Sequence, residues 1–155
     1  EHEQMSEEIF NLIVKAFDDP DQTVKLHILL MCNTAFRRNQ GYSQAIIIGN
    51  KGIKDDDSRI RSATLRMYEQ LIRNSVRYEE ALTAAVEGVK DSAISVRAIA
   101  FDLLIDLTKK RYGYEKALQI ATEGVKDSDN SIREKAYDLF DAFVQIGEAY
   151  DKALS

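Results

Sequence analysis

The chain repeats itself every 36 residues, and this period restricts the possible folds more than any other feature of the sequence. The segment Gly52-Ile53-Lys54-Asp55 returns as Gly88-Val89-Lys90-Asp91 and as Gly124-Val125-Lys126-Asp127, and Ala16-Phe17-Asp18-Asp19 has the same phase. A fixed period of this length is typical of repeat architectures, in which each copy is one small structural unit. The sequence therefore predicts four copies, at about 5–40, 41–76, 77–112 and 113–148.

Each copy contains two apolar stripes with helical spacing, separated by an Asp-rich turn. These stripes predict helical pairs at 5–17 with 21–39, 42–53 with 57–75, 78–89 with 93–111, and 114–125 with 129–147. Asp and Ser side chains near 19–21, 55–58, 91–95 and 127–131 are expected to cap the second helices. The sequence thus predicts an all-α chain in which residues 1–155 form a single domain of stacked helical hairpins.

One hairpin of this length cannot bury its apolar stripe alone, so neighbouring hairpins are expected to share a continuous core. Residues 149–155 repeat the phase of the segment that begins at Tyr114, and they predict the start of a truncated fifth repeat or a C-terminal cap. The last hairpin would then expose an apolar face, which predicts end-to-end self-association. Its members are Phe140, Phe143, Val144, Ala153 and Leu154.

Bulk properties exclude several classes of function. The only cysteine is Cys32, so the chain can form neither an internal disulfide nor a multi-thiolate metal site. The net charge of -5 disfavours generic binding to nucleic-acid phosphates. No stretch approaches the roughly 20 apolar residues that span a bilayer. We expect a soluble, cytoplasmic protein without a cofactor or a membrane span.

The turn and the start of each second helix carry a recurring pair of residues. An Asp in the turn is followed five and six residues later by an apolar residue and a basic one, as in Asp91 with Val96 and Arg97. This pattern resembles the motif of HEAT repeats, which are related to armadillo repeats. The resemblance covers nearly the whole chain, and it implies a right-handed α-solenoid of four HEAT-like hairpins plus the start of a fifth.

The resemblance also implies a structural ladder, in which turn aspartates bond to basic residues of adjacent repeats. In the first copy Lys25 replaces arginine and cannot offer a bidentate fork. The positions implied are Asp19, Lys25, Asp55, Arg61, Asp91, Arg97, Asp127 and Arg133. HEAT proteins are scaffolds and adaptors that hold partners on the concave face formed by second helices.

Second-helix positions that point away from the apolar stripe are the candidate partner-binding residues. They are Arg37, Arg66, Glu69, Arg73, Asp102, Asp106, Lys109, Asp138 and Asp141. Residues 41–76 carry six basic and four acidic side chains, whereas 113–148 carry four basic and eight acidic ones, so a partner with matching charges would be oriented. The competing interpretation is an ordinary solvated face, with basic residues favoured late in helices.

No pattern in the sequence predicts catalysis. The two histidines, His2 and His27, form no metal or triad constellation, and Cys32 lies on an apolar stripe. We predict a non-enzymatic scaffold or adaptor that binds protein partners of unknown identity. The alternatives are a HEAT-like nucleic-acid-binding protein or DNA alkyl-base glycosylase, which the acidic charge and the missing Trp disfavour, and a regulatory subunit that docks on an enzyme.

Overall fold

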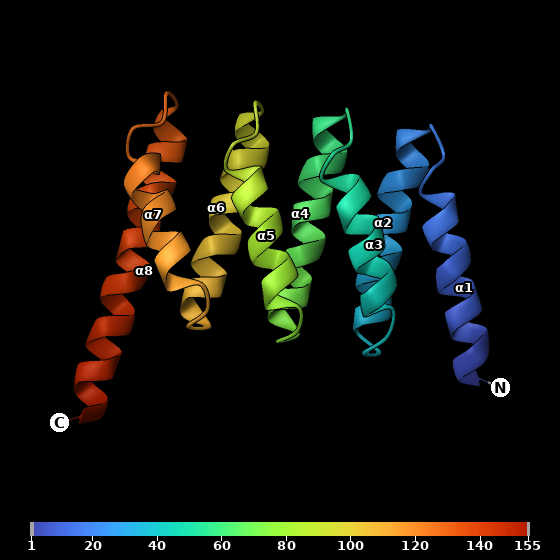
Figure 1. Ribbon diagram of the computed structural model, residues 1–155, viewed down its shortest axis with the longest axis horizontal. Helices are drawn as coiled ribbons and strands as arrows, with labels where there is room; N and C mark the ends of the chain where they lie inside the picture. The colour runs from blue at the N-terminus through green and yellow to red at the C-terminus, as the bar shows by residue number, and fades with distance from the viewer. Residues whose placement is uncertain (1, 155) are drawn as a thin grey trace. The chain divides into compact units, whose positions relative to one another are not determined.

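The computed structural model describes the backbone of residues 2–154 and the side chains of residues 6–147, 151, 152 and 154. Within this range the chain forms eight helices and no strand (Figure 1). The helices are α1 (His2–Ala16), α2 (Gln22–Phe36), α3 (Tyr42–Gly52), α4 (Ser58–Arg73), α5 (Tyr78–Gly88), α6 (Ile94–Lys109), α7 (Tyr114–Gly124) and α8 (Asn130–Leu154). The prediction of an all-helical chain is confirmed, and the expected helical pairs correspond to α1/α2, α3/α4, α5/α6 and α7/α8.

The internal contacts of the chain group it into two compact units, residues 1–80 and 81–155. The first unit contains the hairpins α1/α2 and α3/α4. Helix α2 packs against α4, and α1 packs against α3, so like helices of neighbouring copies lie side by side. The core of this unit includes Phe36, Ile48, Ile60, Leu65 and Tyr68, which are almost fully buried.

The second unit contains most of α5 together with α6, α7 and α8. Helix α8 packs against both α6 and α7, and its core includes Val96, Phe101, Leu104, Ala121 and Leu139. Apolar side chains that recur every three or four residues along α6 and α8 give each helix a buried stripe. In both units, burial between neighbouring hairpins therefore positions the polar residues described below.

The turn inside each hairpin is closed by a recurring aspartate. The Oδ1 atom of Asp19, Asp55, Asp91 or Asp127 accepts a hydrogen bond from the backbone N–H two residues later, at 2.8–2.9 Å. Such a bond holds the chain in a short turn before the second helix begins.

Side-chain caps start most of the second helices. Asp21 and Asp57 accept the N–H groups of Thr23 and Arg59, each at 2.8 Å. The third copy differs from the expectation, because its N-cap residue is Ala93, which has no side-chain oxygen. The backbone at Ala93 still takes the extended conformation of an N-cap residue, although no side chain caps the helix there.

The turns between hairpins shorten the second helices relative to prediction. Helix α2 ends at Phe36, α4 at Arg73 and α6 at Lys109, whereas the apolar stripes predict ends at 39, 75 and 111. Backbone φ is positive at two residues in each following turn: Asn39 and Gly41, Ser75 and Arg77, Arg111 and Gly113. A helix cannot continue through this left-handed region.

Helix α8 is a single helix from Asn130 to Leu154, beyond the predicted end at residue 147. It therefore includes residues 149–154, where the sequence predicts the start of a fifth first helix or a cap. Gly147 corresponds to Arg111 in the repeat, yet it stays helical. The side chains of 148–150 and 153, and all of Ser155, lie outside the described residues.

Candidate binding surfaces

The predicted ladder residues form bonds between neighbouring hairpins in both units. In the first unit Lys25 Nζ lies 2.6 Å from Asp55 Oδ2. In the second unit Arg97 donates through Nε and Nη2 to the two carboxylate oxygens of Asp127, each at 3.1 Å. Both pairs are largely buried, and both join a second-helix base to the turn aspartate of the next copy. Lys25 makes this link with one ammonium group where Arg97 makes a two-pronged one.

The same basic residues also bind their own turn. Arg61 Nη1 donates to the carbonyls of Asp55 and Asp56 at 2.8 and 3.0 Å, and Arg133 Nη1 donates to the carbonyl of Asp127 at 2.7 Å. Arg97 does the same with the carbonyl of Asp91 at 3.0 Å. Each arginine thus ties the start of its helix to the turn before it. Asp19 lies exposed in the first turn and accepts the Asp21 N–H.

The candidate partner-binding residues of the first unit belong to α4 and to the C-cap of α2. Arg37, Arg66 and Arg73 are exposed there. Glu69 differs from them, since only 14% of its side chain is exposed, and it pairs with Arg73 at 2.6 Å and with Arg66 at 3.8 Å. Glu69 therefore holds the Arg73 guanidinium by a hydrogen bond, lies within ion-pair distance of Arg66, and is itself largely shielded from a partner. We name Arg37, Arg66 and Arg73 the basic face.

The corresponding residues of the second unit are mostly acidic. Asp102 is half-buried and accepts a bond from Lys135 Nζ at 2.7 Å. Asp138 and Asp141 are exposed, and Asp141 accepts a bond from Gln145 at 2.7 Å. Asp106 is half-buried, and Lys109 is exposed at the end of α6. The second-helix surface of this unit thus carries carboxylates where the first unit carries guanidinium groups.

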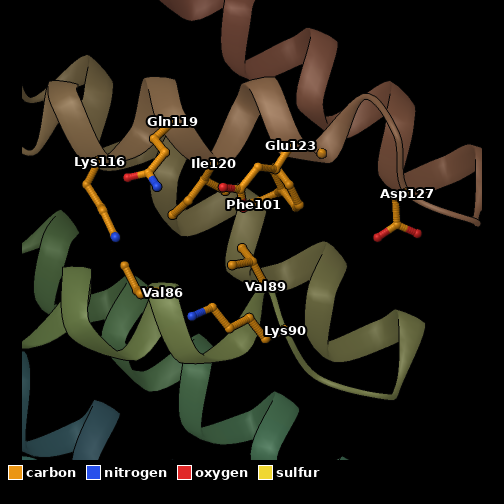
Figure 2. A pocket seen from close by; sticks show the side chains of 10 residues that line it. Val86, Val89, Lys90, Phe101, Lys116, Gln119, Ile120, Glu123 and Asp127 are labelled. Carbon is orange, nitrogen blue, oxygen red and sulfur yellow. The ribbon is translucent and has the colours of Figure 1, made fainter.

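A shallow cavity of about 210 Å³ opens between α5 and α7 in the second unit. Val86, Val89, Phe101 and Ile120 form its apolar part, with Lys90, Lys116, Gln119 and Glu123 at the rim (Figure 2). The Lys116 side chain reaches from α7 toward Val86, and Lys90 lies on the opposite side of the cavity, in the turn after α5. The rim mixes both charges, so this cavity selects no class of ligand by its electrostatics.

The first hairpin carries an apolar groove of about 500 Å³ that the sequence analysis did not identify. Nine side chains from α1 and α2 form it: Ile9, Leu12, Ile13, Ala16, Thr23, Val24, His27, Ile28 and Met31. We name this surface the N-terminal face. The repeat pattern could have revealed it, because Ile9 and Leu12 occupy columns whose members Ala45 and Ile48 are buried in the next hairpin.

The pKa values of Cys32, Asp57 and Asp129 are shifted from their ordinary values. Burial raises the pKa of the Cys32 thiol to about 12, which keeps it protonated and unreactive at neutral pH. The hydrogen bonds from the Arg59 side chain and backbone lower the pKa of Asp57 to about 2. The Ser131 hydroxyl lowers the pKa of Asp129 in the same way. These carboxylates are helix caps, and ionisation strengthens that role.

Neither a metal site nor a membrane-spanning helix is found in the part of the chain that the structure describes. No three His, Cys, Asp or Glu side chains there are grouped so that they could hold a metal ion. None of the helices within residues 2–154 combines the length and the apolar character needed to cross a bilayer.

Comparisons with known proteins support the fold. No protein-family model matches this sequence, and no curated protein matches it either. Among solved structures, the crystal structure of Cex1p is similar, with a TM-score of 0.77 over 96% of this chain and 19% sequence identity. The matched region makes up 30% of the Cex1p chain. At this identity the likeness establishes the fold alone, and together with the eight helices it fits a helical repeat.

Proposed function

We propose that this chain is a HEAT-like α-solenoid module that binds an acidic segment of a partner protein on the basic face of α2 and α4. The observation that carries the proposal is the arrangement around Glu69, a largely shielded carboxylate that pairs with both Arg66 and Arg73. The Arg73 guanidinium, which is hydrogen-bonded to Glu69, loses less side-chain freedom when it binds a partner.

Charge supports a protein partner over a nucleic acid. The whole chain carries a net charge of -5. Part of this negative charge lies on α8 of the second unit, where Asp138 and Asp141 are exposed. Phosphate backbones would be repelled by these carboxylates, whereas a folded partner can contact the basic face alone. An acidic protein segment is therefore the occupant that the surface favours.

The experiment is affinity capture from a cell lysate by the immobilised chain. The double variant Arg66→Glu/Arg73→Glu should lose proteins that the unmodified chain retains, because reversed charges repel an acidic segment. The control Lys54→Glu/Lys90→Glu changes the net charge equally at exposed residues in the turns that follow α3 and α5, and it should retain them. Equal loss in both variants, or in neither, would contradict the basic face.

Two further measurements separate the alternatives. Both variants should keep the melting temperature within a few degrees of the unmodified chain, since these side chains are exposed. A gel-shift assay with duplex DNA at about 50 mM salt should show no complex, because phosphate binding is strongest at low salt. A salt-sensitive complex with DNA would instead favour the nucleic-acid alternative.

A further inference from the structure

The N-terminal face consists of repeat positions that are buried where a preceding hairpin covers them. Leu12 is 64% exposed, yet Ile48 and Ile120, at the same position in the second and fourth copies, are buried within their units. Met31 is likewise exposed, while Met67 and Leu139 are fully buried. In each unit the covering element is the neighbouring hairpin. The N-terminal face is thus shaped to receive another hairpin of this repeat.

Helix α8 exposes the complementary positions. Tyr137 is 62% exposed and Val144 is 59% exposed. Their counterparts in α6, Phe101 and Thr108, are buried in the second unit, where α8 packs against α6. Phe101 lies close to Gly124 of the following hairpin. We name the surface of Tyr137 and Val144 the C-terminal face.

The polar ladder has matching ends. The Arg97–Asp127 pair joins a second-helix arginine to the turn aspartate of the next copy. Arg133 is the equivalent arginine of the last copy, and Asp19 is the equivalent aspartate of the first. Asp19 is exposed, and the Arg133 guanidinium is bound to the Asp127 carbonyl and the Asn130 side chain. Arg133 in the last copy therefore has a potential ion-pair partner in Asp19 of the first copy.

We propose that the C-terminal face of one copy of this chain docks on the N-terminal face of a second copy, in the register that pairs Arg133 with Asp19. This heterologous contact repeats the packing found between hairpins inside each unit, so it leaves one free face at each end and can propagate. The inference does not depend on the basic face or on the partner proposed above.

Two other inter-hairpin bonds predict what else meets in this register. Lys135 of the fourth copy binds Asp102 of the third copy. The equivalent residues at the proposed contact are His27 of the first copy and Asp138 of the fourth copy, and these two can form a hydrogen bond. Lys51 of the second copy binds Asp18 of the first copy. The equivalent residues at the proposed contact are Lys15 of the first copy and Lys126 of the fourth copy, and these two repel each other. Because the Lys15–Lys126 contact is unfavourable, the association is weaker than the packing inside a unit. The variant Lys15→Glu should therefore tighten it.

The first experiment uses sedimentation equilibrium of the whole chain. The average mass should rise above 17.6 kDa with concentration, whereas Leu12→Glu and Tyr137→Glu should each remain at 17.6 kDa. Mixing these two variants should give a 1:1 dimer and nothing larger, since one intact face of each kind remains. The control Ile47→Glu, at an exposed apolar residue of α3, should associate like the unmodified chain.

Several results of that experiment would overturn the proposal. Either blocked variant forming dimers by itself would show pairing between like faces. A mixture of the two variants that stays monomeric, or an unmodified chain that stays at 17.6 kDa up to millimolar concentration, would show that the two faces do not pair. Circular dichroism of each variant checks that the helices remain folded.

The second experiment tests the register in the mixed dimer. Arg133→Gln is placed in the Leu12→Glu chain, and Asp19→Asn, which keeps the turn bond of Asp19, is placed in the Tyr137→Glu chain. Each change should weaken the dimer about threefold, as for a partly exposed ion pair, and the two together should weaken it no further. Multiplicative effects, or none, would contradict the Arg133–Asp19 pairing.

Discussion

At the scale of single residues, the third copy lacks a cap that its neighbours have. Ala93 occupies the N-cap of α6 with φ -84° and ψ 126°, close to the φ -85° and ψ 119° of Asp57 at the same position in α4. The backbone is therefore ready to receive a capping side chain. An oxygen at this position would accept a helix N–H that Ala93 leaves without a side-chain partner.

The variant Ala93→Asp should raise the free energy of unfolding by about 1 kcal/mol, because it supplies the missing acceptor. Urea denaturation followed by circular dichroism measures the change. The matched variant Asp57→Ala removes the same group from α4, and it should lower the free energy of unfolding by a similar amount. A neutral or destabilising effect of Ala93→Asp would contradict the capping geometry.

Two buried threonines provide a second matched pair. The Thr108 hydroxyl is fully buried without a hydrogen-bond partner, whereas the Thr64 hydroxyl donates to the Ile60 carbonyl at 2.8 Å. Thr108→Val should stabilise the chain by about 1 kcal/mol, since it removes an unpaired polar group. Thr64→Val should give no gain. Thermal unfolding of both variants tests this difference, and equal effects would contradict it.

At the scale of helices, the repeat pattern accounts for most of the fold. Two apolar stripes per copy suffice to predict eight helices in the right places, because each stripe must be buried against a neighbour. The ends of the helices could not be predicted as well. The turn residues Asn39, Ser75 and Arg111 take a left-handed conformation that no single residue type marks.

Gly124 and Gly147 lie in differently packed parts of their helices, so substitution by alanine should affect stability in opposite directions. A methyl group at Gly124 would lie 2.6 Å from Phe101 Cζ and 2.9 Å from Ala136 Cβ, so α7 approaches its neighbours more closely than alanine allows. Gly124→Ala should destabilise the chain by about 1–3 kcal/mol.

A methyl group at Gly147 would meet no atom within 4 Å. Gly147→Ala should therefore stabilise α8 by about 0.5–1 kcal/mol, because alanine loses less backbone entropy in a helix. Chemical denaturation of both glycine variants measures the two changes. Destabilisation by Gly147→Ala would show that α8 does not continue as one helix.

At the scale of the whole molecule, the sequence predicted which residues form the surfaces better than it predicted how their side chains are arranged. Column by column, the repeat identified the exposed arginines Arg37, Arg66 and Arg73. It could not show that Glu69 is shielded between two of them, because this depends on side-chain geometry. The N-terminal face was not predicted either, because Leu12 and Met31 follow the apolar pattern of core residues although no neighbouring hairpin of their unit covers them.

The account depends most on which surface a protein partner touches. A photo-cross-linking amino acid at Leu30, the exposed position of α2 that is equivalent to Arg66 in the repeat, tests this in a cell lysate, with the same group at the exposed Ile47 of α3 as the comparison. We predict a cross-linked protein from position 30 that disappears in the Arg66→Glu/Arg73→Glu background, and none from position 47. Cross-linking from position 47 alone would contradict the account.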